Sequence, residues 1–221
     1  MTSREANIID SLLSQRPRFH GNQGAPEDWG IKRPIVEFIA DNVDHSDASL
    51  ETGCGVSTIV FAVKRSRHIA VTPSQGEIDA VSQYAAAHSI PLDTVSFVND
   101  RSENYLPRAN LGPLDFVFID GRHAFPWPAL DYFYTSPKLK LGALLVVDDV
   151  DIPTVKMLSD FLDVDDNWEM VRRFPHTSAY RKVGDRLNVE WVFQHYNANY
   201  QRKSFLRKAT KKTVRAIRGN S

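Results

Sequence analysis

Short apolar runs rich in β-branched and aromatic residues alternate along the middle of the chain with stretches of helical periodicity. The runs expected to form β-strands are 48–52, 68–72, 95–98, 114–120 and 143–148. The stretches expected to form helices are 58–64, 76–88, 128–136 and 151–163. Residues 116–119 and 144–147 are continuously apolar rather than alternating, which is typical of parallel strands that helices cover on both faces.

This alternation of strands and helices predicts an α/β fold with a Rossmann-like, doubly wound and mostly parallel sheet. After residue 167 the pattern changes, and the runs 168–174, 179–183 and 188–195 are expected to be strands joined by turn residues. Strands that follow one another through short turns pair in antiparallel fashion, so we expect a C-terminal hairpin that closes the sheet.

We expect three parts in the chain. Residues 48–195 form one continuous α/β domain, because no repeat or low-complexity tract interrupts them. Residues 1–47 are less regular and predict two helices, 3–15 and 34–42, in an N-terminal helical extension that covers the open edge of a binding cleft. Residues 196–221 form a basic C-terminal tail that is expected to be helical.

Composition excludes several classes of protein. The chain of 221 residues is 42% hydrophobic and 24% charged, which is typical of a folded globular protein and not of a disordered or fibrous one. Its longest strongly apolar run, 141–147, is far shorter than the ~20 residues of a membrane-spanning helix. A single cysteine and the lack of a signal-peptide pattern indicate a cytoplasmic protein.

The charge is unevenly distributed, although the formal net charge is zero. Residues 201–221 carry eight Lys or Arg and no acid, which leaves 19 basic against 27 acidic residues in the rest of the chain. Such a basic segment is either an interaction tail or a solvated terminal helix. Nucleic acid is not the expected partner, because Phe205 is the one aromatic residue among these positive charges.

A glycine turn follows the first strand of the domain and opens its first helix: residues 50–58 read Leu-Glu-Thr-Gly-Cys-Gly-Val-Ser-Thr. Gly53 and Gly55 permit a tight turn and a close approach of the backbone to a ligand. The dinucleotide-binding fingerprint has a third glycine where this chain has Thr58. Glu51 at the strand end would repel a pyrophosphate and suits a cationic ligand instead. Alternatively, Glu51 interacts only with the N-terminus of the helix.

This turn resembles motif I of class I S-adenosylmethionine-dependent methyltransferases, and the likeness extends over 48–195 in the order and type of the strands. The resemblance implies a seven-stranded sheet closed by an antiparallel hairpin. It also implies that the turn binds the cofactor S-adenosylmethionine through Glu51, Gly53, Gly55 and Thr58. The carboxylate of Glu51 would reach the ammonium group of the cofactor directly or through water.

The sequence departs from this family at the ribose subsite. The family usually ends its second strand with an acid that holds both ribose hydroxyls, whereas this chain has Thr72 there. A threonine hydroxyl carries no charge and is expected to bind the ribose less strongly. Glu77 is near in sequence but is expected to lie further down the next helix. Asp100 and Ser102 follow the third strand, where relatives contact the adenine, unless they only cap a helix.

Three carboxylates follow the fourth and fifth strands: Asp120, Asp148 and Asp149. Because the carboxyl ends of neighbouring parallel strands lie together, such like charges need a cation or a raised pKa. Oxygen ligands favour Mg²⁺ or Ca²⁺, so we expect a divalent metal site at this edge of the sheet. Two alternatives stay open: Asp120 contacts only the cofactor, and Asp149 or Asp151 caps the helix that begins near residue 152.

The same spacing resembles the catechol-O-methyltransferase-like branch of the family. In that branch an acid ends the fourth strand, an acid and an amide end the fifth, and a lysine follows the first acid. The matching residues here are Asp120, then Asp148 with Asp149, and His123. Histidine in place of lysine can accept a hydroxyl proton near neutral pH. The alternative is that His123 is an ordinary polar loop residue.

The sequence therefore predicts a methyltransferase that moves a methyl group from S-adenosylmethionine to a hydroxyl of a small molecule, with His123 and Asp120 as catalytic residues and assistance from a divalent metal. The aromatic residues Trp29, Phe125 and Trp127 are expected to exclude water and contact the acceptor. Two other functions stay open: metal-independent transfer to nitrogen or carbon, and non-catalytic cofactor binding with docking through the basic tail. The sequence is also compatible with an oligomer.

Overall fold

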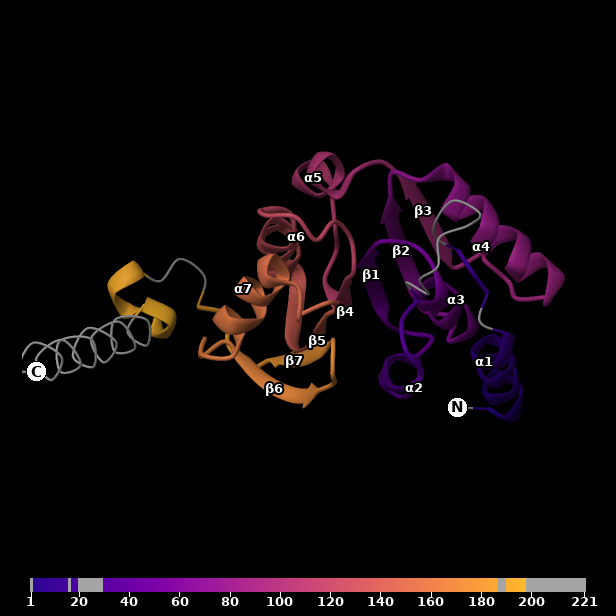
Figure 1. The fold of residues 1–221 in the computed structure, drawn as a ribbon, viewed down its shortest axis with the longest axis horizontal. Helices are drawn as coiled ribbons and strands as arrows, with labels where there is room; N and C mark the ends of the chain where they lie inside the picture. The colour runs from indigo at the N-terminus through magenta and orange to yellow at the C-terminus, as the bar shows by residue number, and fades with distance from the viewer. Residues whose placement is uncertain (1, 16, 20–29, 187–189, 198–221) are drawn as a thin grey trace, which may run out of the picture.

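The computed structural model describes residues 2–15, 17–19, 30–186 and 190–197, which form a seven-stranded sheet with helices on both faces (Figure 1). The strand order is β3-β2-β1-β4-β5-β7-β6. The strands are β1 (Ala48–Thr52), β2 (Arg67–Thr72), β3 (Val95–Asn99), β4 (Leu114–Ile119), β5 (Leu139–Val147), β6 (Trp168–Arg173) and β7 (Ser178–Lys182). These bounds lie close to the predicted ones, except that β5 begins earlier, at Leu139.

Strand pairing confirms the predicted fold class. β1 pairs in parallel with β2 and β4, β2 pairs with β3, and β4 pairs with β5. β7 pairs in antiparallel fashion with β5 on one edge and with β6 on the other, so the hairpin of β6 and β7 closes the sheet. The order of the strands reverses between β1 and β4. Doubly wound sheets bind their ligands at this point, beyond the carboxyl ends of the strands.

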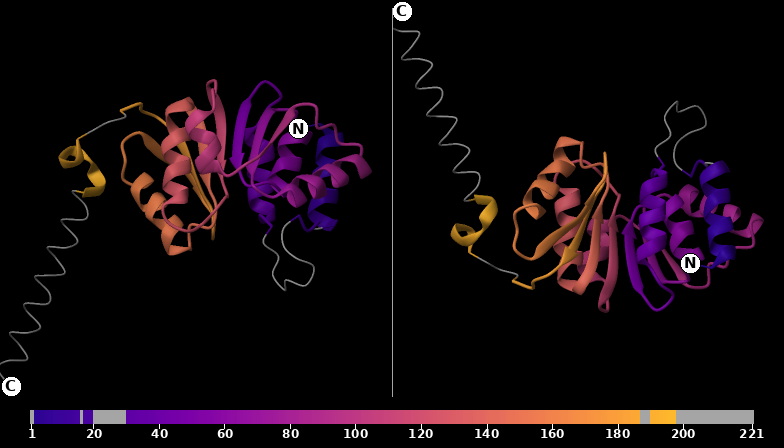
Figure 2. Two further views of the ribbon diagram at one scale, coloured as in Figure 1. Left: turned by 90° about the horizontal axis from the view of Figure 1, so that it is seen from above. Right: turned by 90° about the horizontal axis from the view of Figure 1, so that it is seen from below.

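The helices are α1 (Ser3–Gln15), α2 (Arg33–Asn42), α3 (Val56–Val63), α4 (Gln75–Ala87), α5 (Ser102–Tyr105), α6 (Trp127–Thr135) and α7 (Pro153–Leu162). Helices α1 to α4 pack on one face of the sheet, with Phe116 and Phe118 of β4 (Figures 1 and 2). Helices α6 and α7 pack on the other face, with Val117 and Ile119. Successive residues of β4 are thus buried on opposite faces, which explains the continuous apolar run.

The N-terminal extension forms the two predicted helices. α1 buries Ile9 and Leu12, and α2 buries Val36 and Ile39, all in the hydrophobic cluster that includes α3. Pro34 in the first turn of α2 suits a helix start, because the backbone N–H that proline lacks has no partner there in any helix. The start of α2 also reaches the cavity described below. Its role as a cover over that cavity stays a prediction.

The strand that we predicted at 188–195 is wrong. Trp191–Phe193 form a turn of 3-10 helix, while 187–189 lie outside the described residues. β7 already has a neighbour on each of its edges, so it offers no place for a further strand. The side chains of Trp191 and Phe193 are 62% and 73% exposed instead of being buried on a sheet.

Among the described residues, no helix has the length and the apolar character that a membrane span requires. The predicted basic tail falls almost entirely outside the described part of the chain, which ends at Asn197. The same holds for most of the N-terminal loop, including Trp29. What we expect of these two segments stays a prediction.

Candidate functional site

A cavity of about 760 Å³ opens at the carboxyl ends of β1, β2, β4 and β5, where the doubly wound sheet predicts a ligand site. Its walls come from the turn after β1, the end of β2, the loops after β4 and β5, the start of α2, and the turn between β6 and β7. Its volume falls in the range of roughly 300–1,000 Å³ that is typical of small-molecule sites.

The turn after β1 requires glycine at position 53. Gly53 has φ +111°, which side chains rarely adopt, and a Cβ there would lie 2.7 Å from the carbonyl oxygen of Asp120. The turn therefore packs directly against the end of β4, and Gly53 lines the cavity. The next residue, Cys54, is buried. Burial raises the pKa of its thiol to about 12, so the thiol stays protonated at neutral pH.

Glu51 lies behind this turn. Its side chain is 1% exposed, and its carboxylate accepts hydrogen bonds from the hydroxyls of Ser57 and Thr58. A third hydrogen bond comes from His68 Nε2 at 3.0 Å. The Thr58 hydroxyl oxygen in turn accepts the backbone N–H of Gly55 at 2.8 Å. Glu51, Gly55 and Thr58 are not among the residues that line the cavity, so their contact with a cofactor stays a prediction.

The end of β2 brings Thr72 and Glu77 together. The Thr72 hydroxyl donates a hydrogen bond to Glu77 Oε2 at 2.7 Å, and both residues line the cavity. Glu77 lies in the first turn of α4, where its backbone N–H is capped by the hydroxyl of Ser74. The expectation that Glu77 lies away from the end of β2 is therefore wrong, because this first turn faces the cavity.

The two residues expected near the adenine have different places. Ser102 lines the cavity, whereas Asp100 does not. Asp100 Oδ1 accepts hydrogen bonds from Asn104 at 3.0 Å and from the backbone N–H of Arg101 at 2.8 Å. These hydrogen bonds, together with the nearby Arg108, lower the pKa of the Asp100 carboxyl. Asp100 is therefore held by local contacts just before α5, whose N-cap residue is Arg101, and its contact with a cofactor stays a prediction.

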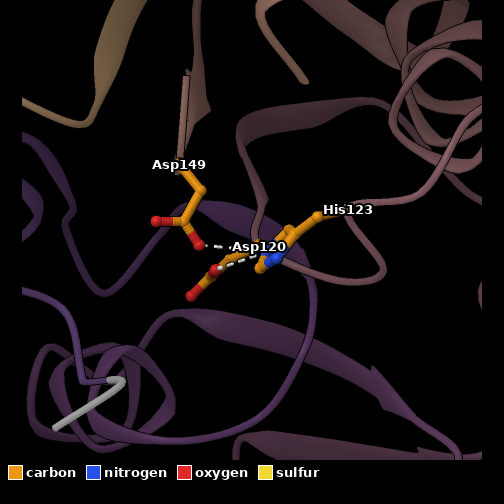
Figure 3. A group of neighbouring side chains, drawn as sticks. All are labelled: Asp120, His123 and Asp149. Atoms are coloured by element: carbon orange, nitrogen blue, oxygen red, sulfur yellow. Dashed lines mark ion pairs between the residues drawn. The ribbon is translucent and has the colours of Figure 1, made fainter. Parts of the chain in front are cut away.

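Asp120, His123 and Asp149 converge on one wall of the cavity (Figure 3). His123 Nε2 lies 3.1 Å from Asp149 Oδ2 and 3.8 Å from Asp120 Oδ1. One ligand atom from each residue lies within 4.8 Å of the other two, which is close enough for all three to bind one metal ion. Asp120 and His123 follow β4 and Asp149 follows β5, so the pairing of these two strands brings the three side chains together.

Asp148 has a different partner. Its Oδ1 accepts a hydrogen bond from the hydroxyl of Thr177, in the turn between β6 and β7. The chain turns sharply after it, because Asp149 has φ +53°, a conformation that aspartate tolerates better than most residues. Of the three predicted metal ligands, the structure thus brings Asp120 and Asp149 together with His123, while Asp148 is bound by Thr177 beside them.

Two carboxyl groups at this wall, those of Asp120 and Asp148, resist ionisation. Burial raises the pKa of Asp120 to about 7 and the pKa of Asp148 to about 6, and the neighbouring carboxylates add to both shifts. The same acids raise the pKa of His123, chiefly through Asp120. Titratable groups with shifted pKa values, gathered on one cavity wall, are typical of catalytic and metal-binding sites.

Some residues of the cavity were missed by sequence reasoning. His176, in the turn between β6 and β7, lines the cavity and pairs with Asp151 at 3.1 Å. The residues next to His176 in the sequence predict a turn and give no indication of a functional site. Its place at the site depends on the antiparallel pairing of β7 with β5, which carries this turn to the carboxyl end of β5. The position of His176 at the site could have been predicted only by assigning the register in which the closing hairpin pairs with β5.

The aromatic residues expected at the site are arranged differently. Phe125 and Trp127 are not among the residues that line the cavity. The ring of Trp127 instead lies against the guanidinium group of Arg122, 4.6 Å from its centre. Phe174, which directly follows the hairpin strand β6, supplies an aromatic wall instead.

A buried acid, Asp131 of α6, lies behind the cavity wall. It is 1% exposed, and its Oδ2 has no hydrogen-bond partner within the described part of the chain. A Cβ added to the cavity residue Gly121 would lie only 3.5 Å from this oxygen. Burial raises the pKa of the Asp131 carboxyl to about 6, although nearby hydroxyl groups oppose the shift.

We expect Asp131→Asn to stabilise the protein at neutral pH. The folded pKa of about 6 lies above the usual 3.8, so the native state keeps this proton at pH values where the unfolded chain has lost it. The stability that Asp131 contributes therefore falls as the pH rises from about 4 to about 6. Asparagine avoids ionisation, which should raise the free energy of unfolding by about 1–3 kcal/mol near neutral pH.

Urea unfolding near pH 7.5 and near pH 4.5 tests this expectation. The gain should be full at about pH 7.5 and fall to roughly a third of that at about pH 4.5, where Asp131 is protonated in the folded state but still partly ionised in the unfolded chain. Asp41→Asn on the exposed surface of α2 is the matched control and should change neither value. An equal gain at both pH values would show that ionisation of Asp131 is not the cause.

A model of the methyltransferase domain family matches residues 50–150, which extend from β1 to the loop after β5. The matched stretch contains the glycine turn, the end of β2, and the cluster of Asp120, His123 and Asp149. A comparison with curated protein sequences found no significant match.

Solved structures with the same fold include several O-methyltransferases. TomG from Streptomyces achromogenes, an O-methyltransferase of tomaymycin synthesis solved with S-adenosylmethionine, is 18% identical with a TM-score of 0.61 over 83% of this chain and 97% of its own. NovP is 13% identical with a TM-score of 0.64 over 81% and 100% of the two chains. An O-methyltransferase from Bacillus cereus, solved with S-adenosylhomocysteine, is 13% identical with a TM-score of 0.58 over 82% and 92%.

The chain therefore has the fold of class I S-adenosylmethionine-dependent methyltransferases, with the hairpin-closed sheet that the resemblance implied. The match of the methyltransferase-domain model over residues 50–150 agrees with this class, and membership of the catechol-O-methyltransferase-like branch stays a prediction.

Proposed function

We propose that this protein binds S-adenosylmethionine in the cavity and transfers its methyl group to a hydroxyl oxygen of a small molecule. The convergence of Asp120, His123 and Asp149 on the cavity wall carries this proposal, because it places a base and two acids beside the glycine turn. Neighbours of the same fold, described as O-methyltransferases and solved with S-adenosylmethionine or S-adenosylhomocysteine, support the cofactor and the acceptor atom.

The cofactor would lie across the ends of three neighbouring strands. Gly53 after β1 would approach its methionine part, and Thr72 with Glu77 after β2 would face its ribose. Ser102 after β3 would face its adenine. These four residues line one continuous cavity, and β1, β2 and β3 are adjacent in the sheet. The methyl group would then point to the side of β4 and β5, where His123 lies.

The acceptor hydroxyl attacks the methyl carbon, so that a carbon–oxygen bond forms as the carbon–sulfur bond breaks. Sulfur keeps the bonding electrons and becomes a neutral thioether. The imidazole of His123 takes the hydroxyl proton, and the carboxylates of Asp149 and Asp120, 3.1 and 3.8 Å from its Nε2, stabilise the imidazolium that results. The basicity of His123 is raised by the same acids, which favours this role.

The cluster also fits a divalent metal ion, because three ligand atoms converge and the buried carboxyl group of Asp120 resists ionisation without a cation. Asp120 and Asp149 would hold the ion beside the acceptor. When bound, it would lower the pKa of the acceptor hydroxyl and help to orient it. Carboxylate oxygens favour Mg²⁺, Ca²⁺ or Mn²⁺, whereas a histidine nitrogen in the set would favour an ion such as Zn²⁺ or Fe²⁺.

Calorimetric titration of the purified protein with S-adenosylmethionine and S-adenosylhomocysteine tests cofactor binding. Binding of neither ligand would overturn the proposal. Methyl transfer is then measured against a panel of catechols, phenols and sugars, with O-methylated products identified by mass. Products methylated on nitrogen or carbon would assign the protein to the alternative transferase class.

Removal of divalent ions should lower the rate of methyl transfer by more than about tenfold, because a bound metal contributes several kcal/mol of charge stabilisation. The measurement compares the untreated protein, the chelated protein, and the chelated protein after Mg²⁺ or Mn²⁺ is restored. Recovery on adding back one ion identifies the metal. A rate that survives chelation would leave the methyltransferase proposal intact and remove the metal from it.

We also infer that Glu77 binds the ribose hydroxyls, in place of the acid that the second strand lacks. Its carboxylate is held at the end of β2 by the Thr72 hydroxyl, at 2.7 Å, and faces the cavity. Glu77→Gln should weaken S-adenosylhomocysteine binding by about 10- to 100-fold, the value of hydrogen bonds to a charged group. Calorimetry of the variant measures this loss.

A second variant separates this role from a general effect on α4. Adding Thr72→Asp to Glu77→Gln restores an acid at the strand end, and should recover most of the lost affinity. Asp79→Asn, on the exposed side of the same helix, is the matched control and should bind as the wild type does. Wild-type affinity in Glu77→Gln would show that the ribose is bound elsewhere.

A further inference from the structure

The acid that ends β1 is held inside the protein by three donors. The carboxylate of Glu51 is bound by the hydroxyls of Ser57 and Thr58 and by the imidazole of His68. Its side chain is 1% exposed and is not part of the cavity wall, although its neighbours Thr52 and Gly53 are. A contact with a ligand in the cavity would require the carboxylate to leave these donors.

His68 contacts this carboxylate from β2 and does not line the cavity. It lies on β2, opposite Ser49 of β1 in the strand register, and its side chain is fully buried. Its ring stacks on Phe61 of α3, with 4.1 Å between ring centres. Its Nδ1 is 2.9 Å from the hydroxyl of Ser49, so both ring nitrogens have partners, and Nε2 is directed at Glu51.

The hydrogen bonds of Glu51 lead to the glycine turn. Ser57 and Thr58 lie in the first turn of α3, and the Thr58 hydroxyl also accepts the backbone N–H of Gly55. The carboxylate therefore fixes where α3 begins relative to β1, and with it the path of residues 53–55. A buried carboxylate is stable only if its hydrogen-bonding capacity is filled. His68 supplies the one donor that comes from outside the turn and its helix.

We propose that Glu51 and His68 act on cofactor binding through the turn: the buried pair holds residues 53–55 in their binding shape, and His68 is a positioning residue. This inference rests on the proposed function. It differs from the expectation that Glu51 contacts the cofactor's ammonium group, because here the Glu51 carboxylate binds donors of the protein itself and not the cofactor.

The two interpretations predict opposite effects of removing His68. If Glu51 contacted the ammonium group, His68→Leu would release the carboxylate toward the cofactor, and S-adenosylhomocysteine would bind as tightly as before or more tightly. If the pair holds the turn, His68→Leu leaves a buried carboxylate one donor short. The affinity should then fall about tenfold or more. His68→Gln keeps an N–H donor near the position of Nε2, and should bind within about threefold of the wild type.

A pair of ligands gives a second, independent test. The full-length protein is titrated with S-adenosylhomocysteine and with its analogue that lacks the α-amino group. Glu51→Gln should weaken both ligands by the same factor, so that the ratio of their affinities stays within about twofold of the wild-type ratio. This conservative variant decides the question even if His68→Leu does not fold, which thermal melts will show.

A loss confined to the ligand that carries the amino group would overturn the proposal, and so would tighter binding by His68→Leu. Ser159→Ala is the matched control for a buried polar deletion, because Ser159 is fully buried, pairs with Tyr180 at 2.9 Å and does not line the cavity. Its affinity for both ligands should equal that of the wild type. Failure of the wild type to bind either ligand is a different result: it would overturn the proposed function, and this inference with it.

Discussion

Replacing His123 with alanine is expected to lower the rate of methyl transfer by about 10²- to 10⁴-fold, the usual contribution of a general base. The imidazole lies on the cavity wall, and the acids around it raise its pKa and therefore its strength as a base. Without it, the acceptor hydroxyl loses the imidazole that lies beside Asp120 and Asp149 to take its proton. Single-turnover measurements at saturating cofactor report this step directly.

Binding of the cofactor should survive the same substitution, because His123 lies at the end of β4 and the residues assigned to the ribose and adenine lie after β2 and β3. We expect the affinity for S-adenosylhomocysteine to stay within about twofold of the wild type. His195→Ala is the matched control: His195 also pairs with an acid, Asp166, at 3.1 Å, but neither lines the cavity. A normal rate in His123→Ala would remove the base assignment. Loss of Mn²⁺ binding would instead make His123 a metal ligand.

Much of the fold follows from the sequence because the pattern that specifies it is local. The central strands β4 and β5 contain apolar runs that are buried on both faces of the sheet, as Phe116 to Ile119 show in β4. The failure at Trp191–Phe193 has a non-local cause. The strand that precedes this run, β7, is already paired on both of its edges, so the run cannot extend the sheet by pairing with it. Local pattern does not contain that information.

The sequence predicted at which strand ends the site lies, but not which side chains at those ends point into the cavity. Gly53, Asp120, His123 and Asp149 were expected at the carboxyl edge of the sheet, and the cavity lies there. Whether an acid faces the cavity depends on partners from other strands and turns. A hydrogen bond from His68 holds the Glu51 side chain in the protein interior, and the Thr177 hydroxyl donates to a carboxylate oxygen of Asp148. By contrast, the Thr72 hydroxyl holds Glu77 at the cavity wall.

The second large effect is expected from Gly53→Ala, which should weaken S-adenosylhomocysteine binding by about 10- to 100-fold. At φ +111° an added Cβ lies 2.7 Å from the backbone carbonyl oxygen of Asp120, which a flexible side chain cannot relieve. Either the turn or the end of β4 must move, and both line the cavity. Backbone strain of about 1–3 kcal/mol, relieved by moving out of the binding shape, gives this loss of affinity.

Gly142→Ala is the control that separates the effect of the steric clash at residue 53 from the effect of placing a side chain at a positive φ. Gly142 also has a positive φ, +86°, but a Cβ there meets nothing within 4 Å, and it lies in β5 away from the cavity. Both variants should lose thermal stability, because both force a side chain into a conformation that favours glycine. Only Gly53→Ala should also lose affinity, as measured by calorimetry on the folded protein. If the two variants bound S-adenosylhomocysteine equally well, the close approach of the turn to Asp120 would not be what shapes the cofactor site.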